Sequence, residues 1–264
     1  MSNISDSQNS QQVWVVIPAA GIGKRMQSDT PKQYLKINDK TILEHTLKCF
    51  TSHPGVAGII VVLSSDDYYW KKIKLSVEAS KKPLYTVEGG KERSDSVMQG
   101  LDYLVMVERL DEKSWVMVHD AARPCLLKKD IDALLSIRND SCVGGILASP
   151  ARDTMKRAVA GGDAENNAGK TIISQTEPRE NLWHALTPQL FRLGELKEAL
   201  ETCLEKGIVI TDEASALEAV DKPVELVEGS SNNIKVTQAT DLELATLLLL
   251  TNVPTNAFSG EHSE

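Results

Sequence analysis

The chain has 264 residues, of which 41% are hydrophobic and 25% are charged, a composition typical of a globular protein with one large domain or two small ones. Its 29 basic and 37 acidic side chains give a net charge of −8, which argues against a nucleic acid as partner because such a partner requires an excess of Lys and Arg. Apolar runs such as Leu247–Leu250 are too short to cross a bilayer, so no membrane partner is expected either. A small cationic pocket is still allowed, since net charge is global and a binding site is local.

The two ends and the cysteines indicate a cytoplasmic protein. Residues 1–12 are polar and have neither the basic start nor the apolar stretch of a secretory signal, so we expect flexible tails over 1–12 and 251–264. The four cysteines are far apart and form no CxxC pair, which argues against a metal site or a disulfide framework. They are Cys49, Cys125, Cys142 and Cys203. Reduced thiols in the cytoplasm are therefore expected.

Short apolar segments rich in Val and Ile alternate with helical patterns through the first 150 residues. Continuous apolarity is typical of parallel strands covered on both faces, and strands that alternate with helices indicate βαβ units. The sequence therefore predicts a single α/β domain over residues 13–250, with a mostly parallel sheet flanked by helices. The expected strands are Val13–Pro18, Gly58–Leu63, Trp115–His119 and Val143–Ala148, and the expected helices are Ile42–Phe50, Asp66–Ala79, Arg93–Val107 and Lys129–Arg138.

The region from about residue 151 to 182 interrupts this alternation. Thr154–Val159 and Thr171–Gln175 have the pattern of strands, and the residues between them are rich in Gly, Asn and Asp. This pattern predicts a β-hairpin arm with a long tip that projects from the sheet.

Helical patterns return in the last third of the chain, over Leu190–Lys206 and Asp212–Val220. A final helix is expected to begin at Thr240, whose hydroxyl can cap the helix while Glu243 completes a capping box.

The first expected strand leads into a turn of small residues that is followed by cations. Small residues let backbone N–H groups approach an anion closely. Three cations at the end of a strand, in an acidic protein, predict a polyphosphate ligand. Met26 stands where a Walker loop and a dinucleotide fingerprint both need glycine, so the turn is neither of these. The small residues are Ala19, Ala20, Gly21 and Gly23, and the cations are Lys24, Arg25 and Lys32.

Asp120 directly follows the strand Trp115–His119, so its carboxylate is expected at the edge where open α/β sheets bind ligands. Beside cations and a polyphosphate, it would be a ligand for Mg²⁺ or another divalent cation. The alternative is a helix N-cap, a role that Asp often fills. His119 is expected to be structural.

Eight segments together carry a resemblance to a known family. They are Pro18–Met26, Pro31–Tyr34, Gly89–Val97, His119–Pro124, Asp153–Arg157, Leu182–Gln189, Thr211–Ser215 and Asn233–Thr237. In these segments and their order, the sequence resembles the 2-C-methyl-D-erythritol 4-phosphate cytidylyltransferases over about residues 13–250. The resemblance implies the Rossmann-like sheet of nucleotidyltransferases, with the projecting arm.

The resemblance also implies a reaction and the residues that perform it. The phosphate of 2-C-methyl-D-erythritol 4-phosphate would attack the α-phosphorus of CTP, and pyrophosphate would leave, in non-mevalonate isoprenoid precursor biosynthesis. By the same resemblance, Arg25 and Lys32 are catalytic and Asp120 holds the metal. The CTP-binding residues are Ala19, Ala20, Gly21, Gly23, Gly89, Gly90 and Ser96, and the polyol phosphate contacts Arg123, Thr154, Arg179, Thr187 and Lys235.

In the family the arm reaches a neighbouring subunit, so the resemblance implies a homodimer whose sites are completed in trans. Lys91 departs from relatives that carry an acidic residue at this position. Two other functions stay open. One is a cytidylyltransferase acting on ribitol 5-phosphate, and the other is a nucleotide-binding module without catalysis, which is disfavoured because Arg25, Lys32, Asp120 and Lys235 are all present.

Overall fold

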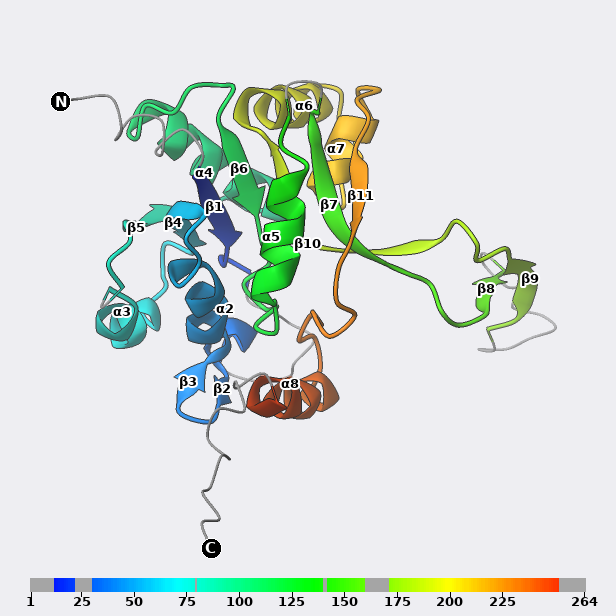
Figure 1. Ribbon diagram of the computed structural model, residues 1–264, viewed down its shortest axis with the longest axis horizontal. Helices are drawn as coiled ribbons and strands as arrows, with labels where there is room; N and C mark the ends of the chain where they lie inside the picture. The colour runs from blue at the N-terminus through cyan, green and yellow to red at the C-terminus, as the bar shows by residue number, and fades with distance from the viewer. Residues whose placement is uncertain (1–11, 22–29, 79, 140–141, 160–170, 252–264) are drawn as a thin grey trace, which may run out of the picture.

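A seven-stranded sheet forms the centre of the protein, as seen in a computed structural model that describes residues 12–21, 30–78, 80–139, 142–159 and 171–251 (Figure 1). The strand order within these residues is β11-β7-β10-β6-β1-β4-β5. The strands are β1 (Val13–Pro18), β4 (Val56–Leu63), β5 (Leu84–Glu88), β6 (Trp115–Val118), β7 (Gly144–Pro150), β10 (Trp183–Arg192) and β11 (Glu225–Glu228).

The direction of the strands confirms the prediction of a mostly parallel sheet. β1 pairs in parallel with β4 and β6, β4 with β5, and β7 with β11. β10 runs antiparallel to both of its neighbours, β6 and β7. The carboxyl ends of β1, β4 and β6 therefore lie at one edge, and β10 begins at that edge.

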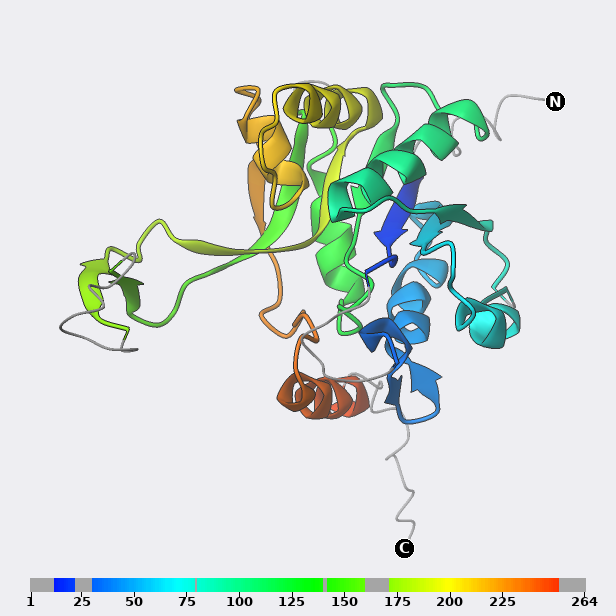
Figure 2. The ribbon, with the colours of Figure 1, turned by 180° about the vertical axis from the view of Figure 1, so that it is seen from behind.

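Helices cover both faces of the sheet, and β1 shows why. Its side chains alternate, so Val13, Val15 and Ile17 enter one core and Trp14 and Val16 enter the other. The first core is closed by α2 (Ile42–Thr51), α3 (Trp70–Glu78) and α5 (Lys128–Ser136), and the second by α4 (Arg93–Met106), α6 (Leu193–Glu205) and α7 (Glu213–Glu218). Figures 1 and 2 show these two helical layers from opposite sides.

Local capping sets where two of these helices begin. Thr41 accepts a hydrogen bond from the Glu44 N–H at 3.2 Å, so α2 starts at Ile42, as predicted. Asp67 accepts hydrogen bonds from the N–H groups of Tyr69 and Trp70, both at 3.0 Å. For this reason α3 begins at Trp70 rather than near residue 66.

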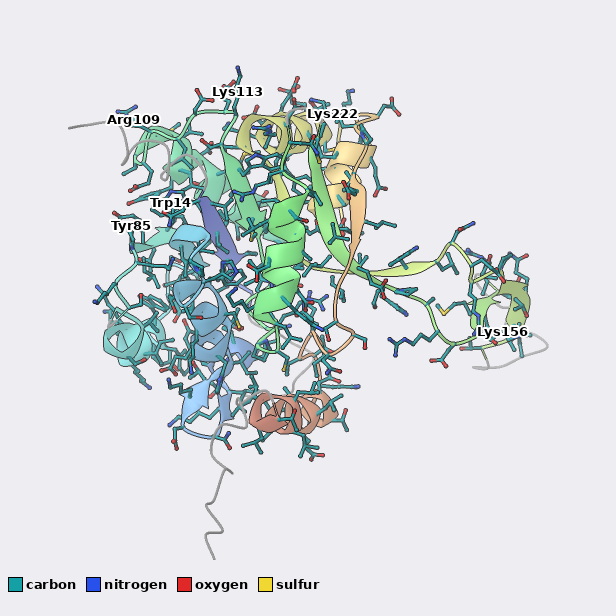
Figure 3. All side chains as sticks on the ribbon, in the orientation of Figure 1. Trp14, Tyr85, Arg109, Lys113, Lys156 and Lys222 are labelled. Atoms are coloured by element: carbon teal, nitrogen blue, oxygen red, sulfur yellow. The ribbon has the colours of Figure 1, made fainter. Side chains whose placement is uncertain are left out.

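A third, smaller core attaches the C-terminal helix α8 (Ala239–Thr251) to the body beside the short strands β2 (Lys36–Ile37) and β3 (Lys40–Thr41). On the side of the sheet that ends in β5, the Trp14 ring of β1 stacks on Tyr85 of β5 with 6.0 Å between centroids, and Figure 3 shows these two side chains next to each other. No described helix is long and apolar enough to cross a membrane.

An antiparallel pair, β8 (Met155–Ala158) and β9 (Ile173–Glu177), stands at the position of the expected hairpin. It extends far from the sheet in both ribbon views, and Lys156 marks its outer part in Figure 3. The expected tip, residues 160–170, lies outside the described residues.

Two expectations about the last third of the chain were wrong: the start of α6 and the capping box of the final helix. Leu190 belongs to β10, and α6 begins at Leu193. The adjacent apolar residues Leu190 and Phe191 enter the two cores on opposite faces of the sheet, and such a pair suits a strand covered on both faces as well as the start of a helix. Of the sheet strands, β11 in this region and β5 in the first third of the chain were not predicted. The capping box of Thr240 and Glu243 is absent from the described α8. Instead, the Asp241 carboxylate accepts hydrogen bonds from the N–H groups of Thr237 and Gln238 at 2.8 and 3.0 Å.

Candidate active site

A pocket lies at the carboxyl ends of β1 and β6, beside the start of α4. This is the edge where open α/β sheets bind ligands, as predicted from the position of Asp120. Most of the expected nucleotide-binding residues of the described chain meet here, together with Lys32, Asp120 and Lys235. The lining residues are Pro18, Ala19, Ala20, Gly21, Lys32, Gln33, Gly90, Lys91, Glu92, Arg93, Ser96, Asp120, Ala121, Ala122 and Lys235.

The Asp120 carboxylate is the electrostatic centre of this pocket. Oδ1 accepts a hydrogen bond from Arg93 Nε at 3.3 Å. Oδ2 is contacted by Arg123 Nε at 3.2 Å and Lys235 Nζ at 3.0 Å. Three cations from three distant parts of the chain therefore converge on one carboxylate, which leaves an excess of positive charge at the base of the pocket.

Burial and neighbouring charges act in opposite directions on Asp120, which is 8% exposed. Burial alone would raise the pKa of its carboxyl, but Arg93, Lys235 and Arg123 outweigh burial and hold the pKa far below its usual value. Asp120 is therefore ionised at every physiological pH. It keeps the three cations in place before any ligand arrives.

A directed chain of hydrogen bonds holds Asp120 from behind. Its N–H donates to Thr187 Oγ1 at 3.1 Å, and this hydroxyl lies 3.0 Å from His119 Nδ1. His119 Nε2 lies 3.1 Å from the Arg123 carbonyl oxygen, which can only accept, so Nε2 carries the proton and Nδ1 accepts from Thr187. This arrangement requires a neutral imidazole. Burial lowers the pKa of His119 to about 4, in agreement with a structural role for this residue.

Asn233 links the same region to the segment that carries Lys235. Its side-chain Nδ2 donates to the Thr187 backbone carbonyl oxygen at 2.6 Å. The backbone carbonyl oxygen of Asn233 accepts from Arg123 Nη1 at 2.8 Å. Arg123 and Thr187 thus lie behind the pocket and orient Asp120.

Arg93 is fixed from its other side by Glu213 at the start of α7. Nη1 and Nη2 of Arg93 donate to the two oxygens of Glu213 at 2.6 and 3.0 Å, a bidentate pair in which Glu213 is 1% exposed. Burial alone would lower the pKa of Arg93, whereas Glu213 and Asp120 raise it above its usual value. The guanidinium is therefore permanently charged and held against Asp120.

The first glycine-rich turn forms the opposite wall, together with a short 3-10 helix over Lys32–Tyr34. Gln33 Nε2 donates to the carbonyl oxygens of Ala19 at 2.7 Å and Gly21 at 3.2 Å. Lys32 lines the pocket next to this turn. Of the cations expected beside the turn, Lys24 and Arg25 lie outside the described residues, as does Gly23.

The second glycine-rich segment packs tightly against the first turn. A Cβ on Gly89 would stand 2.7 Å from Ser96 Oγ and 2.8 Å from the Ala20 side chain, and one on Gly90 would stand 2.2 Å from Asp95 Cβ. Side chains at both positions would collide, which explains the two glycines. Ser96 is buried and its hydroxyl donates to the Glu92 carbonyl oxygen at 3.2 Å.

Two expected substrate residues, Thr154 and Arg179, do not lie with the others. Both are exposed and belong to the arm region, and the Arg179 guanidinium donates to the Arg152 carbonyl oxygen. Neither lines the pocket of its own chain.

Asp120 could bind a magnesium ion only together with oxygen atoms from a bound phosphate and from water. Asp120 offers one hard carboxylate oxygen, Oδ1, whose one contact among the described residues is that with Arg93. No group of three or more His, Cys, Asp or Glu side chains in the described part of the chain could hold a metal ion. Such a site suits Mg²⁺, which is usually bound by one or two carboxylates with phosphate oxygens and water.

Four residues of this site had not been assigned a role from the sequence: Arg93, Glu213, Gln33 and Asn233. All four stand inside motifs that carried the family resemblance, so their position was visible. Their roles were not, because each acts on a partner that only the fold brings near, such as Glu213 on Arg93 across 120 positions.

Comparison with known proteins agrees with this geometry. Residues 13–251 match the family model described as 2-C-methyl-D-erythritol 4-phosphate cytidylyltransferase. Proteins of that name from Alteromonas mediterranea and Pseudomonas putida (strain GB-1) are 49% and 48% identical, over 91% and 87% of this chain and 94% and 92% of theirs. Two crystal structures cover 90% of this chain and 99% of their own. A 4-diphosphocytidyl-2C-methyl-D-erythritol synthase has a TM-score of 0.74 and 34% identity, and the Francisella tularensis cytidylyltransferase has 0.71 and 37%.

Proposed function

The chain belongs to the 2-C-methyl-D-erythritol 4-phosphate cytidylyltransferase family, and we propose that it transfers a cytidylyl group from CTP to 2-C-methyl-D-erythritol 4-phosphate with release of pyrophosphate. This reaction belongs to the non-mevalonate synthesis of isoprenoid precursors. The observation that carries the proposal is the surplus of positive charge around Asp120, in a pocket walled by two glycine-rich segments.

The reaction requires little of the protein beyond positioning of the two substrates and stabilisation of negative charge. The attacking phosphate is already ionised at neutral pH, so no general base is needed, and His119 is occupied by structural hydrogen bonds. Charge accumulates on the phosphoryl oxygens during transfer, and preorganised cations stabilise it. We assign this role to Arg25 and Lys32, and Lys235 lines the same pocket as Lys32. We assign the binding of CTP to the two glycine-rich segments and Ser96.

Asp120 is the residue of this chain that would hold Mg²⁺ or another divalent cation. The ion would neutralise charge on the triphosphate of CTP. Arg93, Arg123 and Lys235 hold the carboxylate in place for it.

A pyrophosphate-release assay with CTP tests the function directly. We expect turnover with 2-C-methyl-D-erythritol 4-phosphate and far less with ribitol 5-phosphate or glycerol 3-phosphate. Replacement of CTP by ATP, GTP or UTP serves as the control for the base. Turnover with ribitol 5-phosphate alone would assign the enzyme to that substrate, and nucleotide binding without turnover would favour a silent binding module.

We also propose a homodimer in which each arm completes the partner's site. Thr154 and Arg179 lie away from the pocket of their own chain, and the arm region exposes large apolar side chains. These are Val159, Ile172, Ile173, Leu182 and Trp183, which are 37% to 61% exposed. A second copy of the chain would cover them and bring Arg179 to a polyol phosphate.

Complementation between two impaired variants, assayed at a concentration of the polyol phosphate that limits Arg179→Ala, tests this arrangement. Lys32→Ala keeps an intact arm, and Arg179→Ala keeps an intact pocket. If each arm serves the other subunit, an equal mixture that exchanges subunits should regain about one quarter of the wild-type rate, because half of the dimers are mixed and each has one complete site. No recovery in a mixture that demonstrably exchanges subunits would show that the arm serves its own chain, and a monomer by sedimentation would exclude the dimer.

The proposed setting is the cytoplasm. All four cysteines, Cys49, Cys125, Cys142 and Cys203, are free thiols in the structure, which suits a reducing compartment.

A further inference from the structure

Gln33 is a buried polar residue that serves neither the charge of the pocket nor the hydrophobic core. Its side chain is 4% exposed, and Nε2 lies 2.7 Å from the Ala19 carbonyl oxygen and 3.2 Å from that of Gly21. A side-chain amide has two N–H donors, and these two carbonyl groups use both. Gln33 therefore bridges the two ends of the Ala19–Gly21 turn.

This bridge decides which way the turn presents its backbone. The Ala19–Ala20 peptide is trans, so its N–H points opposite to its C=O. The C=O is directed at Gln33, and consequently the Ala20 N–H is directed away from it. Within the described part of the chain, no acceptor is found for this N–H, whereas the neighbouring Ala19 N–H donates to the Val62 carbonyl oxygen at 2.7 Å.

Gln33 is itself held in a fixed position. The next residue, Tyr34, is 5% exposed, its hydroxyl donates to Asp67 Oδ2 at 2.7 Å, and its ring stacks on Tyr69 at 5.2 Å. Asp67 also caps α3. The short helix that carries Gln33 is thus joined to the body of the protein through Tyr34.

We propose that Gln33 is a positioning residue that keeps the Ala20 N–H directed at a phosphate of the bound nucleotide. This inference rests on the proposed function for the identity of the nucleotide. A turn of small residues has many conformations, and ordering it at the moment of binding would cost conformational entropy. Gln33 orders the turn beforehand, so a phosphate meets a prearranged donor. The side chain acts through the backbone and touches no substrate.

Two variants of similar size separate this role from simple packing. Gln33→Met removes both donors without adding charge, and Gln33→Glu replaces them with a carboxylate that repels the two carbonyl oxygens. Calorimetric binding of inorganic tripolyphosphate tests the turn without base, sugar or turnover. KM values for CTP and for the polyol phosphate are measured alongside it.

The matched control is His53→Leu. His53 is 2% exposed and also bridges segments by hydrogen bonds, accepting from the Gly55 N–H at 3.1 Å and contacting Asp132 at 3.0 Å. It lies at the opposite edge of the sheet, where the Val13 N–H donates to the Gly55 carbonyl oxygen. A loss of buried hydrogen bonds there should lower stability and leave anion binding unchanged.

For Gln33→Met we expect Kd for tripolyphosphate and KM for CTP to rise about tenfold, the loss expected for a hydrogen bond to a charged group. The rise for Gln33→Glu should be at least as large. KM for the polyol phosphate should change less than about twofold in both. A similar rise in His53→Leu, or unchanged tripolyphosphate binding in folded Gln33 variants, would overturn the proposal. If Gln33→Met does not fold, the tripolyphosphate binding of Gln33→Glu decides whether the proposal holds. Tripolyphosphate binding by a wild type that does not transfer cytidylyl groups would refute the proposed function and leave this test valid.

Discussion

Protonation of His119 should destabilise the protein. In the folded state, the Asp120 N–H donates to Thr187 Oγ1, the Thr187 hydroxyl donates to His119 Nδ1, and His119 Nε2–H donates to the Arg123 carbonyl oxygen. A proton on Nδ1 would leave Thr187 Oγ1 between two donors and its own hydrogen without an acceptor. The buried imidazolium would also lose its hydration, and for this reason the pKa of His119 falls to about 4.

The magnitude follows from proton linkage. The unfolded chain binds a proton at His119 near pH 6.5, its ordinary pKa, and the folded chain binds one only near pH 4. The contribution to stability is therefore fully present above pH 6.5 and is lost as the pH falls from 6.5 to about 4. A difference of this size corresponds to a loss of about 3 kcal/mol.

Urea unfolding at several pH values between 7 and 4.5 measures this loss, with the variant His119→Gln as reference. Gln can still donate to the Arg123 carbonyl oxygen but does not titrate. We expect the free energy of unfolding to fall more steeply with decreasing pH in the wild type than in the variant. NMR titration of the wild-type imidazole measures the pKa directly. Equal slopes, or a His119 ring that titrates near pH 6.5 in the folded protein, would refute the reasoning.

Three further predictions concern charge. Lys32→Ala and Arg25→Ala should keep the fold, checked by circular dichroism, and lower kcat roughly 10²-fold or more; near wild-type kcat in both would contradict their assignment. Glu213→Gln should lower the free energy of unfolding by about 3 kcal/mol, because the buried residue 213 would then offer one acceptor oxygen instead of two and no charge opposite Arg93. Glu201→Gln, in an exposed pair with Lys197, is its control and should cost less than about 1 kcal/mol in the same urea experiment. Arg179→Ala should raise KM for the polyol phosphate more than KM for CTP, and an equal rise in both would argue that the arm organises the nucleotide.

The elements that could be predicted from the sequence are those with a local signal. β1 ends at Pro18 as expected, because a continuous apolar run stops at a turn of small residues. α4 begins at Arg93 as expected, after the Gly89–Gly90 turn. Asp120 was placed correctly at the sheet edge because it follows a strand directly.

β10 had no such local signal. Its last residues include the buried apolar Leu190 and Phe191, which are followed within two residues by Leu193 at the start of α6, so strand and helix could not be separated by periodicity. The same limit applies to the site. That Arg93 contacts both Asp120 and Glu213 depends on where three distant segments meet, and no local pattern carries that information.

The antiparallel strand β10 has a consequence for how the protein folds. It is made after β6 and β7, yet it stands between them, so these two strands have no neighbour in common until β10 arrives. Thr187 reaches the Asp120 N–H across 67 positions of the chain. Closing such a long loop lowers the conformational entropy of the chain before the new contacts stabilise it. The late insertion of a central strand is therefore slow. During synthesis, Asp120 and Arg123 therefore leave the ribosome well before the strand that orders them, and the charged centre of the pocket forms together with the completed sheet.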